Sequence, residues 1–287
     1  MTDRVFITEC PRDAMQGIAE WIPTEKKVNY LNSLLQVGFD VLDFGSFVSP
    51  KAIPQMRDTA EVLAQLDTQS PTKLLAIVAN EKGAEQACSF DEIRFLGYPF
   101  SVSETFQQRN THASIEESIA RLLHIQNLAQ KAGKQVMVYF SMAFGNPYGD
   151  EYHPDIVARW VERLSSEMPL SHIALSDTIG SADTAGITEL FTTIIPQFRS
   201  IQVSAHLHAR PEQVKAKTEA AFLAGCRHFD GAIKGFGGCP MAKDDLTGNM
   251  DTELMFDWFE KQGIQSGILA DKLNYSSNLA VQVFPFA

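Results

Sequence analysis

The feature that most constrains the fold is a regular alternation of short apolar runs with longer amphipathic segments along the 287 residues. Eight of the short runs have the length and composition of buried strands, at residues 5–8, 40–44, 74–79, 93–96, 136–140, 172–176, 201–205 and 228–232. The segments between them carry apolar residues at helical spacing, as at Val28, Leu31 and Leu35. Strands that alternate with helices predict parallel pairing, because each helix returns the chain to the same end of the sheet.

Two of the intervening segments carry clear helix signals. The sequence predicts a helix over residues 114–132, because Ser114 and Glu117 have the spacing of a capping box and Gly133 follows as a stop. Another helix is predicted to begin near Pro211, since proline fits the first helical turn.

About eight strand–helix units in one chain predict a single TIM (β/α)8 barrel rather than a doubly wound sheet. No glycine-rich dinucleotide loop follows the first strand, which weakens the doubly wound alternative. No linker or low-complexity stretch divides the chain, so we expect one α/β domain over residues 1–287. The segment after Asp251 is long enough for the last barrel helix and an additional C-terminal helical segment.

Charge and cysteine usage exclude several functional classes. The net charge of −11 and the pI of about 5.1 argue against a nucleic-acid-binding protein, which needs a basic face. The four cysteines, at positions 10, 88, 226 and 239, have neither disulfide-framework nor zinc-finger spacing. No apolar stretch reaches the roughly 20 residues that cross a membrane. These observations predict a cytoplasmic protein without nucleic-acid or membrane partners.

In a TIM barrel, functional groups lie at the carboxyl ends of the strands and in the loops that follow them. His206 and His208 lie at such an end, and alternate residues of an extended chain point to the same side. Other polar residues at these positions are Glu9, Arg12, Asp13, Gln16, Asp43, Ser46, Ser49, Lys51, Ser141, Asn146, Tyr148, Asp177, Thr178, Cys239 and Asn249.

The two histidines have two interpretations, a hydrogen-bonded pair at the barrel rim or two ligands of one metal ion. Asp13 favours the metal, because the last strand of a closed barrel lies beside the first and brings this carboxylate near the histidines. A site of imidazoles, a carboxylate and a carbonyl oxygen suits Mg²⁺ or Mn²⁺ better than a thiolate-rich zinc centre.

Several stretches resemble one known family over nearly the whole chain. They are ECPRDAMQ (9–16), SFVSPKAIPQM (46–56), NTHASIEES (110–118), SDTIG (176–180), AHLH (205–208), GFGGCP (235–240) and TGN (247–249). The SFVSPK run with the following PQM, and the GGCP run after the eighth strand, are highly specific. The chain resembles 3-hydroxy-3-methylglutaryl-CoA lyase, within the DRE-type metallolyase barrels.

The resemblance implies a retro-Claisen cleavage of an acyl-CoA substrate to acetyl-CoA and acetoacetate, a reaction of leucine degradation, in a homodimer or higher homo-oligomer. It implies a divalent metal, Mg²⁺ or Mn²⁺, held by Asp13, His206, His208 and Asn249. It also implies that Arg12 stabilises the enolate and that Cys239 and Asp177 handle protons, with His206 and Asp43 in the same catalytic set. Substrate contacts are expected from Gln16, Ser46, Lys51, Asn110, Ser141 and Arg210.

The chain departs from the family pattern at several of these places. Cys10 and Ala14 replace glycines, and Asp43 replaces a glutamate. Residues 209–212 read Ala-Arg-Pro-Glu where the family has an acidic residue and then Tyr-Gly. Two alternatives therefore stand beside the lyase: another metal-dependent aldolase or Claisen condensing enzyme acting on 2-oxo acids, and a barrel that keeps the metal without turnover.

Overall fold

Eight parallel strands close into one barrel in chain order, which confirms the prediction of a TIM barrel. The computed structural model describes residues 3–237 and 247–284. The strands are β1 (Phe6–Glu9), β2 (Val41–Ser46), β3 (Lys73–Ile77), β4 (Ile93–Ser101), β5 (Gln135–Ser141), β6 (His172–Asp177), β7 (Gln202–Leu207) and β8 (His228–Gly231). Strand β8 pairs with β1, with Phe6 opposite His228, and this pairing brings the segment after β1 next to the last strands.

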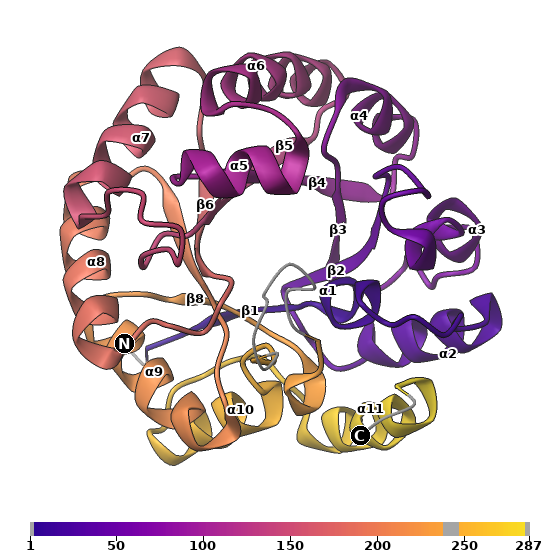
Figure 1. The fold of residues 1–287 in the computed structure, drawn as a ribbon. Helices are drawn as coiled ribbons and strands as arrows, with labels where there is room; N and C mark the ends of the chain where they lie inside the picture. The colour runs from indigo at the N-terminus through magenta and orange to yellow at the C-terminus, as the bar shows by residue number, and fades with distance from the viewer. Residues whose placement is uncertain (1–2, 238–246, 285–287) are drawn as a thin grey trace.

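Helices surround the barrel (Figure 1). The outer ring consists of α2 (Thr24–Leu34), α3 (Thr59–Leu63), α4 (Glu81–Cys88), α6 (Ile115–Lys131), α7 (Pro154–Glu167), α8 (Thr184–Gln197), α9 (Pro211–Leu223) and α10 (Thr252–Lys261). The additional C-terminal helix is α11 (Ala270–Val283), which packs against α2. No helix among the described residues is long and apolar enough to cross a membrane.

Four short elements lie in connections that leave the carboxyl ends of strands. They are the helices α1 (Pro11–Gln16) and α5 (Glu104–Thr111) and the 3-10 turns η1 (Pro54–Met56) and η2 (Ile233–Gly235). The sequence analysis did not predict helix α1 and placed its polar residues in a loop. Its six residues are too few to show a helical period, although Pro11 stands at the first helical position.

The predicted ends of two helices are confirmed. The Ser114 hydroxyl accepts the N–H of Glu117 at 3.1 Å, and the Glu117 carboxylate accepts the N–H of Ser114 at 2.8 Å, so α6 begins with the capping box. Gly133 follows α6 with a φ of 69°, a conformation that glycine adopts without strain. Helix α9 begins at Pro211.

Strand β4 is longer than predicted. The sequence analysis ended this strand before Gly97, but the strand continues to Ser101 beside β5. A Cβ at Gly97 would collide with Cδ1 of Ile77 inside the barrel, so the glycine is there for space and does not break the strand.

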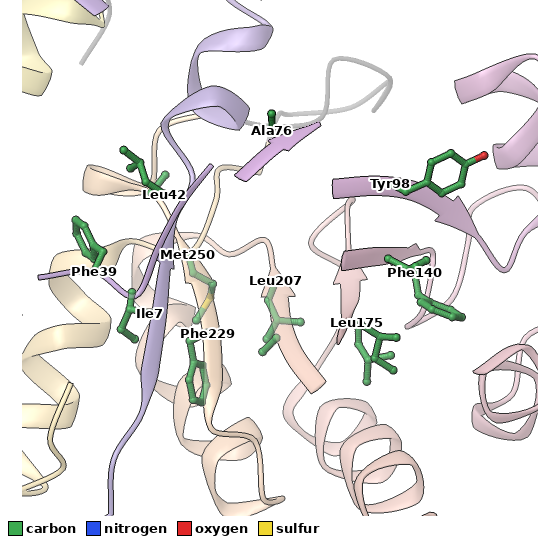
Figure 2. Packing of buried hydrophobic residues seen from close by; sticks show 14 of the residues in the cluster. Ile7, Phe39, Leu42, Ala76, Tyr98, Phe140, Leu175, Leu207, Phe229 and Met250 are labelled. Carbon is green, nitrogen blue, oxygen red and sulfur yellow. The ribbon is translucent and has the colours of Figure 1, made fainter. Parts of the chain in front are cut away.

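Alternate residues of each strand face two apolar layers. In β5, Val138 and Phe140 belong to the large cluster between strands and helices, whereas Met137 and Tyr139 belong to a small cluster inside the barrel. Successive side chains of a strand point to opposite faces, so the two layers follow from position alone. Figure 2 shows part of the outer layer, including Leu175, Leu207 and Phe229. The same alternation decides which polar side chains point into the barrel.

Candidate active site

The alternation points His206 of β7, and His208 directly after this strand, into the barrel. Ala205 and Leu207 pack in the outer layer, so His206 and His208 face inward. Asp13 on α1 meets them there: one potential ligand atom from each of the three residues lies within 4.8 Å of the others, and all three residues are buried. The structure therefore brings together the three residues that the sequence analysis proposed as metal ligands from separate segments.

The second nitrogen of each imidazole already has a partner. Nδ1 of His206 lies 3.1 Å from Oδ2 of Asp230, and Nδ1 of His208 lies 2.9 Å from the carbonyl oxygen of Thr247. A neutral imidazole that donates through Nδ1 keeps its lone pair on Nε2. Both rings can therefore offer Nε2 to a cation.

Asn249 completes this group from the segment after β8. Its side-chain nitrogen donates to Oδ2 of Asp13 at 3.0 Å and to the carbonyl oxygen of Phe236 at 2.9 Å. Asn249 also forms a backbone bridge with His208. Two imidazoles, a carboxylate and an amide oxygen form a mixed nitrogen and oxygen donor set, which fits a Mg²⁺ or Mn²⁺ ion.

Arg12 connects the donor set to two further polar residues. Its guanidinium donates to both oxygens of Asp43, with Nη2 to Oδ2 at 2.5 Å and Nε to Oδ1 at 3.2 Å. Nη1 donates to Oδ1 of Asp13 at 2.9 Å and to the side-chain oxygen of Gln16 at 3.0 Å. Gln16 in turn donates to Oδ1 of Asp13 at 2.6 Å. The guanidinium is therefore fixed beside the donor set by two carboxylates.

Burial and charge act against each other at these groups. Burial alone would raise the pKa of Asp13, but Arg12 and the two histidines lower that pKa overall. Burial raises the pKa of Asp43 to about 6 in spite of the attraction of Arg12. Burial lowers the pKa of His208. At His206 the hydrogen bond and charge of Asp230 outweigh burial, and the pKa is raised.

A cavity of about 430 Å³ opens beside this group. One part of its lining is polar and consists of Arg12, Asp13, Gln16, Tyr139, Ser141, Ser176, Thr178, His206 and His208. The rest of the lining consists of apolar residues of β3, β4, α5 and the segments after β2 and β3, with Arg109, Asn110, Thr111 and His112 from α5 and the turn that follows it. Gln16, Asn110 and Ser141, three of the expected substrate contacts, therefore face one cavity.

Asp177 is placed differently from the histidines. It continues the outward-facing positions of β6, and its carboxylate accepts the N–H groups of Ser181 and Ala182, each at 2.9 Å. Lys217 on α9 lies 3.4 Å from Asp177 and donates to the carbonyl oxygen of His208 at 2.7 Å. Asp177 is not among the described residues that line the cavity, and it reaches the donor set through Lys217.

Three more expected contacts lie outside the cavity lining as far as the structure describes it. The Ser46 hydroxyl lies 3.3 Å from the carbonyl oxygen of Ile77, to which it donates. Lys51 is exposed in the turn after β2. Arg210 is exposed at the start of α9, where its N–H donates to the side chain of Gln213 at 3.0 Å. Cys239, the remaining expected catalytic residue, lies outside the described residues.

The sequence analysis missed two residues that contact His206. Asp230 on β8 bonds its ring nitrogen, and Tyr139 on β5 packs edge-on against its ring with centroids 5.3 Å apart. Both residues lie within runs that were interpreted only as strands. The alternation along each strand was the available signal, since Phe229 and Phe140 face outward and their neighbours therefore face inward.

Comparisons with known proteins agree with this geometry. The HMGL-like family model matches residues 5–280. Hydroxymethylglutaryl-CoA lyase YngG of Bacillus subtilis is 33% identical over 92% of this chain and 87% of its own length. The mitochondrial hydroxymethylglutaryl-CoA lyase of Mus musculus is 33% identical over 92% of this chain and 80% of its own length.

Solved structures give the same result. The HMG-CoA lyase of Bacillus subtilis superposes with a TM-score of 0.91 at 32% identity, covering 98% of this chain and 93% of that one. An HMG-CoA lyase from Acenitobacter baumannii, in complex with coenzyme A and 3-methylmalate, has a TM-score of 0.90 at 29% identity and covers 98% of this chain and 91% of its own. With a family model that spans nearly the whole sequence, this chain belongs to the HMGL-like family.

Proposed function

We propose that this chain is a divalent-metal-dependent carbon–carbon lyase that cleaves 3-hydroxy-3-methylglutaryl-CoA, or a related 3-hydroxyacyl-CoA, to acetyl-CoA and acetoacetate, or a related 3-oxo acid. The observation that carries the proposal is the group of Asp13, His206 and His208 in the lining of the cavity, with Arg12 beside it. Similarity to lyases over most of both chains favours cleavage over an aldolase or a condensing enzyme.

The reaction needs a proton to leave the tertiary alcohol and an electron pair to reach the thioester. As the alcohol loses its proton, the bond to the CH₂ group next to the thioester breaks and the alcohol carbon becomes a ketone. The electron pair forms the enolate of acetyl-CoA, and protonation of the enolate carbon completes the products. A divalent ion held by Asp13, His206, His208 and Asn249 would lower the pKa of the alcohol and orient the substrate.

Arg12 is the group that we assign to the enolate oxygen. Asp43 and Asp13 hold the guanidinium in place, and their charges outweigh burial and raise the pKa of Arg12, so that it stays cationic. A fixed cation stabilises charge as it develops without having to reorganise. Arg12 also lines the cavity, so its charge is available to a bound thioester.

Proton transfer is assigned to Cys239, whose thiol is more acidic than an alcohol. In the sequence it follows Gly235, Gly237 and Gly238, and it lies outside the described residues. Asp177 is proposed to support proton handling from behind His208, through its contact with Lys217.

The lining of the cavity supports an acyl-CoA as the substrate. The apolar residues of the lining, among them Val48, Ile77 and Phe106, suit the thiol arm of the coenzyme, and Arg109 supplies a cation to the same lining. A related lyase has been solved with coenzyme A, as described above. A cytoplasmic location, which rests on the cysteine usage and the apolar pattern of the sequence, and a homodimeric or higher assembly, which rests on the family resemblance, are further proposals.

The test is to measure acetyl-CoA release from a panel of 3-hydroxyacyl-CoA thioesters in the presence of Mg²⁺. We expect cleavage of 3-hydroxy-3-methylglutaryl-CoA or a close relative, and none of 3-methylglutaryl-CoA, which lacks the alcohol that must lose its proton. Asp13→Asn serves as the matched variant and should lose activity. If a chain that binds the metal cleaves no member of the panel, the lyase proposal is wrong, and the two alternatives, an enzyme acting on 2-oxo acids and a barrel without turnover, remain.

A further inference from the structure

Asp230 makes a buried contact with His206, a member of the metal-ligand group. It lies on β8, next to β7, and the two strands pair with Ser204 opposite His228. Two residues further along both strands, this register brings Asp230 beside His206, and Oδ2 of Asp230 lies 3.1 Å from Nδ1 of His206. The side chain of Asp230 is 1% exposed and that of His206 is 8% exposed. The contact is therefore made away from bulk water.

The second oxygen of Asp230 is left without a hydrogen-bond partner within residues 3–237 and 247–284. A buried carboxylate in that state is unfavourable, because each unpaired polar atom loses its bonds to water. An apolar residue would avoid this cost if the position served only packing. Unsatisfied groups of this kind in a native structure call for another explanation, and a role at the functional site is a common one.

The ring of His206 is held on a second side by Tyr139. The two rings meet edge-on with centroids 5.3 Å apart, and the Tyr139 hydroxyl, like Oδ1 of Asp230, has no partner in the part of the chain that the structure describes. The sulfur of Cys10 lies within 4.8 Å of the ligand atoms of His206 and Asp230. His206 is thus enclosed by side chains that leave its Nδ1 one strong acceptor, Asp230.

We propose that Asp230 is a positioning residue that keeps the proton of His206 on Nδ1 and so directs Nε2 to the metal. A carboxylate can only accept a hydrogen bond, so it selects the tautomer that donates through Nδ1. An amide at this position could donate instead, which would place the ring proton on Nε2 and block the metal. Such outer partners of metal-bound histidines change metal affinity by roughly 10–100-fold.

The two histidines are then oriented by different means. His208 donates to the backbone carbonyl of Thr247, a partner that no side-chain substitution removes. His206 depends on a side chain, so its orientation can be altered by changing one residue. This difference gives a clear experiment, because only one of the two ligands should respond to a change at Asp230.

The experiment is a Mn²⁺ titration without substrate, followed by electron paramagnetic resonance, on wild type, Asp230→Asn and the matched control Asp58→Asn. Asp58 is also a buried carboxylate, paired with Lys27 at 2.7 Å, but it is not among the described residues of the metal-ligand group. We expect Asp230→Asn to raise the Kd for Mn²⁺ by about 10–100-fold and Asp58→Asn to leave it within about twofold. Equal Kd values in wild type and Asp230→Asn would overturn the proposal.

The proposal rests on the metal site of the proposed function, and a second measurement separates the two. The ¹⁵N shifts of labelled imidazoles in the metal-free wild type report which nitrogen of His206 carries the proton. We expect the Nδ1–H form, and an Nε2–H form would contradict the role of Asp230 even if Asp230→Asn failed to fold. If the wild type has the Nδ1–H form but binds no Mn²⁺, the proposed metal site is wrong, and the proposed role of Asp230 is wrong with it.

Discussion

Arg12 is expected to contribute both to the stability of the fold and to catalysis. It neutralises Asp43 and Asp13 in a buried cluster, and it is also the cation assigned to the enolate. Arg12→Gln should therefore lower kcat by about 10²–10³-fold, the usual effect of losing a preorganised charge at an oxyanion. The same change should lower the free energy of unfolding by about 3–5 kcal/mol, because it leaves buried carboxylates unpaired.

A double variant separates these two effects. Arg12→Met combined with Asp43→Leu removes both partners of the ion pair, and replacing a whole buried pair by apolar residues is often close to neutral for stability. Thermal unfolding should return toward wild type in the double variant while kcat stays low. A kcat within about tenfold of wild type in Arg12→Gln would show that the enolate does not depend on this charge.

Cys239 is tested by its chemistry. Cys239→Ser should reduce turnover strongly and leave Mn²⁺ binding unchanged, because a serine hydroxyl is far less acidic than a thiol. Alkylation should inactivate the free enzyme, and bound acyl-CoA should protect it. Cys10 and Cys226 are buried, with thiol pKa values raised by burial, so they should contribute little to this inactivation. Full activity of Cys239→Ser would exclude the proton role.

The site residues differ in how far the sequence could predict them. His206 and His208 were predictable, because two residues of one type at alternate positions of a strand must share a face. Asp177 also follows a strand, but it faces the helices, and position at a strand end does not tell the two faces apart. Asp230 was missed because one acidic residue in a short apolar run gives no pattern, and its partner lies on another strand.

At the scale of elements, Glu9 of β1 forms hydrogen bonds with both η2 and α10, which follow β8 in the chain. Its carboxylate accepts the N–H of Ile233 at 2.8 Å and the hydroxyl of Thr252 at 2.6 Å, and the side chain is fully buried. Burial raises the pKa of Glu9 from 4.5 to about 8, despite these two hydrogen bonds. Its protonation is therefore linked to folding.

The sign of the linkage follows from the two pKa values. Between pH 4.5 and about 8 the folded chain keeps a proton that the unfolded chain has released, so stability falls as pH rises through this window. The loss is at most about 1.4 kcal/mol per pH unit. Glu9→Gln is always neutral, so thermal unfolding from pH 5 to 9 should show a flatter profile for the variant. Parallel profiles for the two proteins would contradict the raised pKa.

The main helices of the outer ring and the strands were predictable because each carries a period of its own. The capping box of α6 and Pro211 of α9 mark starts that depend only on nearby residues. Helices α1 and α5 were not predicted, since six and eight residues are too short for a clear period. They matter for function, because α1 carries Arg12 and Asp13 to the carboxyl end of the barrel.

At the scale of the whole molecule, the barrel could be predicted from the number and order of its units. Eight strand–helix repeats leave few arrangements in which every strand is buried on both faces, and a closed barrel is one of them. Closure then places β1 beside β8, which is why Asp13 meets histidines almost 200 positions later. The sequence could not supply the side-chain contacts between strands, because these depend on register.

The most direct test of the account is the metal dependence of 3-hydroxy-3-methylglutaryl-CoA cleavage. Acetyl-CoA release should stop when a chelator removes the metal and return when Mg²⁺ or Mn²⁺ is added. The His208→Ala variant should need at least about tenfold more metal for half-maximal activity. Losing a ligand should weaken metal binding at least as much as losing a residue that only supports a ligand, which costs about 10–100-fold. Undiminished turnover by rigorously metal-free wild type would contradict the assignment of Asp13, His206, His208 and Asn249 to a functional metal site.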